Sequence, residues 1–316
     1  MKQLCSGSVS SQFYTLSKLL PVMIDIVRHE DRVDPVASTT EALNHLINSN
    51  GTNAVDVFIE QGVLAALCER LQASRAMIVF SCLRALAFVA ACSSETQITA
   101  MDPVARHLQD LVLGVDGEAP SHKVFAQAGL LVSMLCKHGE RAIQLILDES
   151  PGVFQQFFDV LNLRTAAQIK QNKVNNKAQN CALALMYAAQ RGSNAQLAHL
   201  LGQGLYTLCF RVLFTFDDIA NLLVQTLKAL RRLVVKVENI AEVQNGEEEF
   251  QADRAWGQVR QLMHTNKSGF AHPPELEANS DSGMENDSQS TTDAKVRKYA
   301  TRLYEAAAAQ GLVNGK

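Results

Sequence analysis

The sequence has few prolines, few aromatic residues and no pattern that indicates a β-strand. Its 316 residues include 7 prolines and one tryptophan, and aromatic residues make up 6%. We find neither the alternation of apolar and polar residues that is typical of a half-buried strand nor an alternation of strand and helix patterns. Hydrophobic residues make up 47% and charged residues 19%. This composition predicts an all-α protein with a substantial core.

A large excess of charge, a signal peptide and a cysteine framework are also missing. The net charge of −3 argues against a broad nucleic-acid-binding surface, although it leaves a local basic patch open. The first residues, MKQLCSGSVSSQF, lack an apolar signal-peptide core. The most apolar segment, Met77–Cys92, is short and contains Arg84, so it predicts a buried helix and no membrane span. The 7 cysteines form no CxxC pair, which indicates free thiols in a reducing compartment. We expect a cytoplasmic protein with access to the nucleus.

Sequence motifs for catalysis, nucleotides and metals are absent. There is no HExxH, no Cys/His spacing for zinc, and no GxSxG, P-loop or GxGxxG. We therefore expect no catalytic residues, no cofactor and no metal ion. One alternative stays open, an enzyme in which Cys136 is the nucleophile beside His138, because catalytic partners can come from distant positions. Cys136 also fits a core position on an apolar helix face.

The chain contains instead a helical unit that recurs. Between Phe58 and Ala91 the pattern predicts a short helix that ends near Gly62, a second helix over Val63–Leu71 and a third over Met77–Ala91. Gly62 stands at the corner between two helices, where a residue without a Cβ permits either positive φ or a close backbone contact. One such unit cannot bury its apolar faces alone, so several units must stack.

Five units of this kind follow one another. The corners at which their second helices begin lie near positions 21, 63, 104, 153 and 205, which are 42, 41, 49 and 52 residues apart. Armadillo and HEAT arrays have periods of roughly 40–47 residues. Pro21 and Pro103 suit the first turn of a helix, where the missing N–H is not needed. The third helices are predicted over residues 36–47, 77–91, 123–137, 177–190 and 219–237, with a polar insert at 164–176.

The sequence divides into four segments. Residues 1–12 predict a flexible start, and residues 13–264 predict a helical repeat domain closed by a capping helix near Trp256. Residues 265–293 are polar and acidic and predict a disordered linker. Residues 294–316 predict an amphipathic helix and a tail. This last helix either docks on the repeats or binds another molecule.

The repeats over residues 13–237 resemble the armadillo family. The resemblance implies a right-handed superhelical solenoid of about five three-helix repeats, which binds extended peptides or proteins on a concave surface lined by the third helices. Nuclear-import adaptors of that family carry a Trp and an Asn four residues apart on these helices. No such pair occurs at the aligned positions here, so we expect no recognition of nuclear-import peptides. The aligned pairs are Glu41 and His45, Arg84 and Phe88, Leu130 and Met134, Leu183 and Tyr187, and Lys228 and Arg232.

The sequence thus predicts a non-catalytic scaffold or adaptor, a monomer or weak oligomer, that binds a protein or peptide and no nucleic acid. A shift of one residue in the alignment would turn the paired positions into ordinary core positions. A chaperone cofactor stays an alternative, because short armadillo proteins of similar size exchange nucleotide on a chaperone ATPase. The predicted partner-binding residues are His45, Arg84, Phe88, Met134, Tyr187 and Arg232.

Overall fold

The computed structural model describes residues 13, 17–115, 118–162, 176–216, 219–236, 252–264, 285–310 and 312–313. The predicted flexible start, most of the polar insert and residues 265–284 lie outside this part. Within it, the regular structure is helical apart from one isolated bridge between Val115 and Glu118. The predicted all-α class is confirmed.

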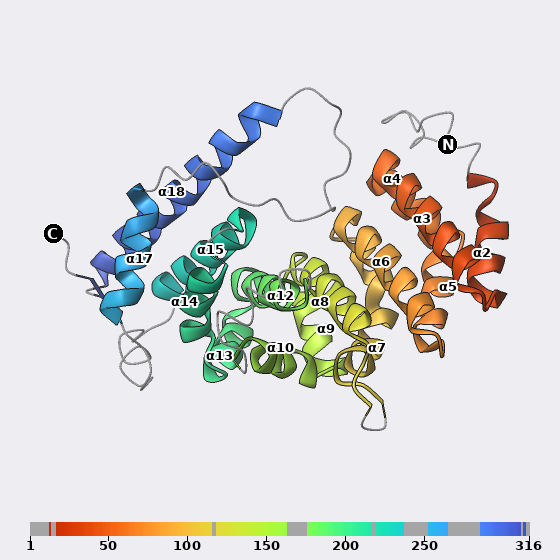
Figure 1. Ribbon diagram of the computed structural model, residues 1–316, viewed down its shortest axis with the longest axis horizontal. Helices are drawn as coiled ribbons and strands as arrows, with labels where there is room; N and C mark the ends of the chain where they lie inside the picture. The colour runs from red at the N-terminus through yellow and green to blue at the C-terminus, as the bar shows by residue number, and fades with distance from the viewer. Residues whose placement is uncertain are drawn as a thin grey trace. The chain divides into compact units, whose positions relative to one another are not determined.

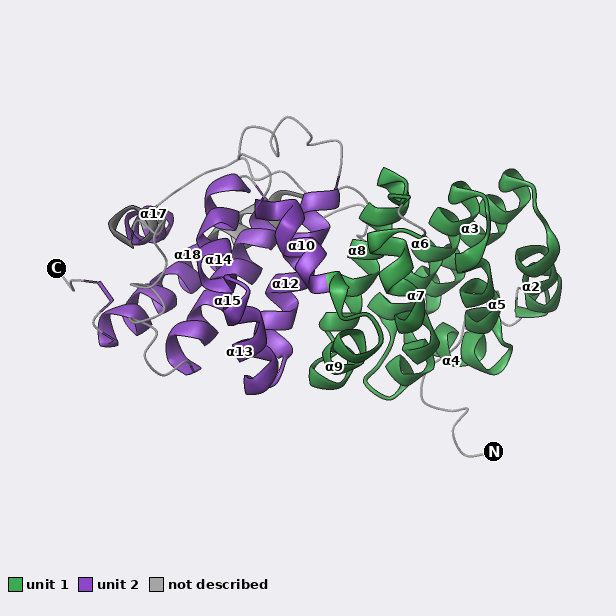
Figure 2. Cartoon of the chain, turned by 90° about the horizontal axis from the view of Figure 1, so that it is seen from below, with its two compact units in different colours: residues 1–153 green, residues 154–316 purple. Residues whose placement is uncertain are grey.

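The chain forms two compact units, residues 1–153 and residues 154–316 (Figure 2). In the first unit, the helices α3, α6 and α8 pack side by side, and shorter helices cover them (Figure 1). Its elements are α2 (Leu20–His29), α3 (Val33–Asn50), α4 (Thr52–Glu60), α5 (Val63–Glu69), η1 (Arg70–Gln72), α6 (Ala76–Cys92), η2 (Gln97–Met101), α7 (Asp102–Leu113), α8 (His122–Cys136) and α9 (Glu140–Glu149).

The second unit repeats this arrangement. Here α15 packs against α12 on one side and α18 on the other, and α17 packs against α18. Its elements are α10 (Gly152–Asn162, which begins at the boundary), α12 (Lys177–Arg191), α13 (Asn194–Gly202), α14 (Leu205–Thr215), α15 (Ala220–Lys236), α17 (Ala252–His264) and α18 (Glu285–Ala309).

The five predicted third helices correspond to α3, α6, α8, α12 and α15, and every boundary agrees within three residues. Their long apolar stripes explain this agreement, because each stripe is buried against two neighbours. In α6, Ala85, Ala87 and Ala90 are fully buried. Small side chains at these positions let the adjacent helices approach closely.

The corners follow local chemistry that the sequence displays. Gly62 and Gly204 have φ of 80° and 89°, left-handed values, and each immediately precedes a second helix. The predicted positive φ at Gly62 is therefore confirmed. Pro21 and Pro103 lie in the first turns of α2 and α7, as predicted. The side chain of Ser193 caps α13 in a capping box with Gln196.

The C-terminal helix starts earlier than predicted. α18 begins at Glu285, inside the segment that the sequence assigned to the linker, and runs to Ala309. The helix docks on α15 and α17 through side chains that are at most 2% exposed: Val296, Ala300, Leu303 and Ala307. With respect to α15 it occupies the place of a further third helix.

The apolar helices are short, and most of the described cysteines are buried. Within the described ranges no single helix is long and apolar enough to cross a membrane, although the bent pair α13 and α14 together passes such a test by length and composition. Cys92 is partly exposed, and the other described cysteines are buried: Cys68, Cys82, Cys136, Cys181 and Cys209.

Candidate binding surfaces

Among the described residues, no element of the first unit packs closely over one face of its third helices. α6 contacts α3 and α8 on its two sides, and α5, η1 and α4 cover it from behind. Side chains of α6 that keep partial exposure in its middle, Phe80 and Arg84, must therefore lie on the remaining face. On α8 the corresponding partly exposed residues are Leu130 and Met134.

We call Phe80, Arg84, Leu130 and Met134 the apolar face. Each pair lies four residues apart on its helix and so shares one side of it, and α6 and α8 are neighbours. Three of the four side chains are large and apolar, and one carries a guanidinium group. This arrangement can contact an apolar side chain of a peptide and one of its carbonyl or carboxylate groups.

The structure places Arg84 and Met134 on this face, whereas Phe88 lies at its edge. Phe88 is only 7% exposed, so it belongs mainly to the core. Phe80 was not among the residues predicted from sequence. It lies one helical turn before Arg84, and extending the pattern of four by one step would have found it.

In the second unit the aligned third-helix positions are partly buried or in contact with a neighbouring helix. Tyr187 is half-buried, and burial raises the pKa of its hydroxyl, an effect that Arg191 opposes. Leu183, one turn earlier, is 6% exposed. On α15 the ammonium group of Lys228 lies 5.0 Å from the ring centroid of Tyr299 on α18.

Arg232 binds the end of a neighbouring helix. Its guanidinium donates to the carbonyl oxygen of Ala189 in the last turn of α12 at 2.9 Å and to that of Gly192, which follows the helix. These carbonyls have no partner within their own helix. Sequence reasoning could not foresee this contact, because a backbone acceptor leaves no signal in residue type.

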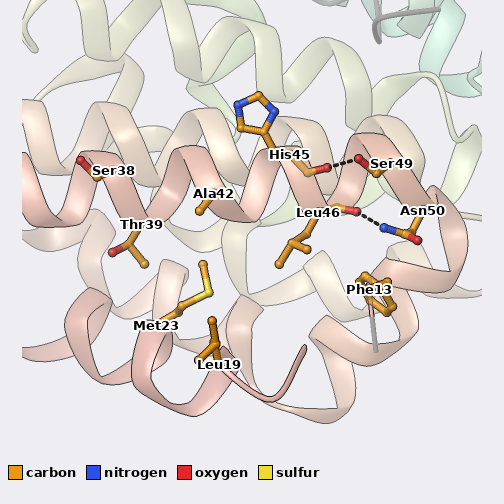
Figure 3. A pocket seen from close by; sticks show the side chains of 10 residues that line it. All are labelled: Phe13, Leu19, Met23, Ser38, Thr39, Ala42, His45, Leu46, Ser49 and Asn50. Carbon is orange, nitrogen blue, oxygen red and sulfur yellow. Dashed lines mark hydrogen bonds between the residues drawn. The ribbon is translucent and has the colours of Figure 1, made fainter. Parts of the chain in front are cut away.

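His45 lies far from the apolar face in sequence and lines a pocket of its own. The pocket has a volume of about 520 Å³ and lies between α2 and α3 (Figure 3). Leu19, Met23 and Leu46 converge between these helices, and the exposed His45 lies at the rim. The pocket is mainly apolar, so it suits an apolar group better than an ion.

The thiol considered as a nucleophile is poorly placed for that chemistry. Cys136 is fully buried, and burial raises the pKa of its thiol above the usual range. The Nε2 atom of His138 lies 2.7 Å from the carbonyl oxygen of Ala90, to which it donates a hydrogen bond, so this nitrogen is already engaged. In the described part of the chain, no group of three or more His, Cys, Asp or Glu side chains is placed to hold a metal ion.

No protein-family model matches the sequence, and no curated protein matches it either. Solved structures do. A designed armadillo repeat protein is 18% identical, with a TM-score of 0.65 over 91% of this chain and 99% of that one. Another, solved in complex with the peptide (KR)4, is 18% identical with a TM-score of 0.64 over 91% and 98%. The protein SYS-1 is 12% identical with a TM-score of 0.60, over 95% of this chain and 50% of its own.

These similarities concern the fold. The chain is an all-α solenoid with an armadillo-like repeat fold, as the resemblance of its repeats implied. Identities this low say nothing about which surface binds or what it binds.

Proposed function

We propose that the protein is a non-catalytic scaffold that captures a peptide or a segment of a partner protein on the apolar face of its first unit. The observation that carries the proposal is the alignment of half-buried apolar side chains on the side of α6 and α8 that the other described elements leave open. Side chains of this kind are costly to leave in water and gain from further burial.

The energetics favour an extended ligand with apolar anchors. Completing the burial of a half-exposed Leu, Met or Phe side chain contributes on the order of 1 kcal/mol. Adjacent helices lie about 8–10 Å apart, a distance that two or three extended residues span. Anchors two or three residues apart would therefore reach Phe80 on α6 and Met134 on α8.

A protein of similar fold supports the proposal that this kind of fold binds a peptide. One designed armadillo repeat protein with this fold was solved with a bound peptide, (KR)4. The apolar face does not suit such a basic peptide, because the positive charge of Arg84 would repel its Lys and Arg side chains. We therefore propose a ligand that is apolar with an acidic or neutral flank.

In the second unit we treat Tyr187 as a separate candidate contact residue, whereas Arg232 supports the helix stack of that unit. Tyr187 is partly exposed and lies on the third helix α12. Arg232 is committed to backbone carbonyls of α12, so we assign it a positioning role.

Selection from a random peptide library, followed by titration of the enriched peptide, tests the proposal. The variant Leu130→Asp/Met134→Asp places two charges on the apolar face at positions that are already partly exposed, so the fold should tolerate it. The control Leu113→Asp places a charge on α7, a second helix, at a residue 41% exposed. Circular dichroism confirms that each variant is folded.

We expect the enriched peptide to bind the intact chain and the control alike, and to bind the double variant at least about tenfold more weakly. Equal binding to all three would place the site elsewhere. Failure to enrich any peptide would contradict the scaffold proposal itself.

A further inference from the structure

Basic side chains gather on the last third helix and on the C-terminal helix. Between Ala220 and Lys236, α15 contains Lys228, Arg231, Arg232 and Lys236 and no acidic residue. Beside it α18 contributes Lys295, Lys298 and Arg302, all exposed. This concentration contrasts with the chain as a whole, whose net charge is −3.

One of these residues contacts a tyrosine, and three others lie one helical turn from that contact. Tyr299 of α18 lies 5.0 Å, measured at its ring centroid, from the ammonium group of Lys228 on α15. On α18, Lys295 and Arg302 lie about one turn to either side of Tyr299 and share its face. On α15, Arg231 lies one turn after Lys228. We call Lys228, Arg231, Lys295 and Arg302 the basic face. Figure 1 shows α15 and α18 side by side in this region.

The charges of the basic face are not neutralised within the described part of the chain. None of the ion pairs found between described residues involves these four residues. On the described part of α18 one exposed acidic side chain, Glu305, follows Arg302. Like charges held this close repel one another, so an acidic ligand would stabilise the arrangement.

We propose that the basic face binds an acidic segment of a partner protein in an extended conformation. Two or three extended residues span the distance of about 8–10 Å between neighbouring helices. A segment with carboxylates at that spacing would therefore meet Lys228 and Arg231 on one helix and Lys295 and Arg302 on the next. Tyr299 lies between them, and its hydroxyl can donate to a further carboxylate.

The chemistry of the face favours a peptide over a nucleic acid. Sites for single strands expose aromatic rings on which bases stack, whereas the Tyr299 ring already has the ammonium group of Lys228 near it. A long polyanion would also extend beyond a patch confined to two helices and meet a chain whose net charge is negative.

This proposal does not depend on the apolar face, which lies on other helices and in the other unit. A failed peptide selection for the apolar face would not count against the basic face, and a failed test of the basic face would not count against the apolar face.

Fluorescence anisotropy with labelled probes tests it on the full-length chain. The probes are a short peptide of alternating Asp and Glu, a peptide of alternating Lys and Arg, an oligothymidine strand, and vesicles that contain phosphatidylserine. The variant Lys228→Glu/Lys295→Glu reverses two charges of the basic face. The control Arg75→Glu/Arg191→Glu makes the same change of net charge at two exposed residues elsewhere.

We expect the acidic peptide to bind the intact chain and the control equally, with an affinity that falls as salt rises, and to bind the variant about tenfold or more weakly. If the reversal variant unfolds, Lys228→Gln/Lys295→Gln replaces it, with a smaller loss expected. Three results would each overturn the proposal: no binding at low salt, an equal loss in the control, or tighter binding of oligothymidine or vesicles than of the acidic peptide.

Discussion

The corner glycines hold backbone conformations that other residues avoid. At Gly62 and Gly204 the φ angles are 80° and 89°, yet beyond the glycine and its two chain neighbours no heavy atom lies within 4 Å of the place where a Cβ would stand. Substitution is therefore opposed by backbone conformation alone and not by a clash. This separates the cost of positive φ from the cost of crowding, which usually occur together.

We expect Gly62→Ala and Gly204→Ala each to lower the free energy of unfolding by about 1–2 kcal/mol, because L residues pay that much in the left-handed region. Urea denaturation measures it. The control is Gly202→Ala in α13, which has space for a Cβ and no positive φ; it should be neutral or stabilising by about 0.5–1 kcal/mol. Equal effects at Gly202 and Gly204 would show that the corner is ordinary helix.

Two buried thiols make stability depend on pH. Burial raises the pKa of Cys68 and of Cys82 from 9.0 to about 12. The folded state therefore holds these protons at pH values where the unfolded state has released them. Their contribution to stability is complete below about pH 9 and is lost as the pH rises from there toward about 12.

We expect the free energy of unfolding to fall between about pH 8 and about pH 10, and to fall less steeply in Cys68→Ala/Cys82→Ala, by on the order of 2 kcal/mol. Urea titrations at both pH values measure the difference, and the comparison cancels the titration of other groups. Identical pH dependence in the two proteins would mean that these thiols are not protected by folding.

At the scale of the element, side chains of one repeat bind the last carbonyls of a helix in the preceding repeat. A carbonyl at a helix end has no partner within the helix, and the stacked neighbour supplies one. The bonds are Arg70 to the carbonyl of Glu30 after α2 (3.0 Å), His138 to Ala90 in α6 (2.7 Å), Arg211 to Asn162 in α10 (3.1 Å) and Arg232 to Ala189 in α12 (2.9 Å). They connect successive repeats by a directional contact in addition to apolar packing.

Removing one such contact should destabilise the stack. We expect Arg232→Met to lower the free energy of unfolding by about 1.5–3 kcal/mol, because it leaves the carbonyls of Ala189 and Gly192 unpaired. The neighbouring substitution Arg231→Met, at an exposed residue, should change it by less than about 0.5 kcal/mol. A similar loss in both variants would assign the effect to charge and not to the carbonyl contacts.

The C-terminal helix should behave as part of the core. Leu303 of α18 is fully buried, so Leu303→Ala should cost about 2–5 kcal/mol in thermal or urea unfolding. The exposed Arg302→Ala next to it is the control and should be nearly neutral. A tolerated Leu303→Ala would mean that α18 is not firmly docked on α15 and α17.

The elements that the sequence could reveal are those with strong periodicity. The apolar stripes of α6 and α8 predicted the boundaries of these third helices closely, because a helix that is buried on several sides has a long apolar pattern. The start of α18 was missed because its first turns are polar and have no stripe. Among the predicted site residues, Phe88 lies mainly in the core, because its exposure depends on the neighbouring helix. Arg232 binds backbone carbonyls, and such acceptors have no sequence signature.

At the scale of the whole molecule, two compact units present different chemistry on the same kind of helix. The apolar face of the first unit and the basic face of the second would let one chain hold two different segments. A partner that carries both kinds of segment would gain from simultaneous binding. This is a property of repeat arrays, in which each third helix can change its exposed residues without changing the stack.

Hydrogen–deuterium exchange of the full-length chain with and without the enriched peptide shows whether the peptide binds the apolar face, because it locates a ligand without any substitution. We expect slower exchange over α6 and α8, with exchange over α5 and α7 on the covered side unchanged. Protection confined to second helices, or to the pocket between α2 and α3, would contradict the claim that the third-helix face of the first unit is the binding surface.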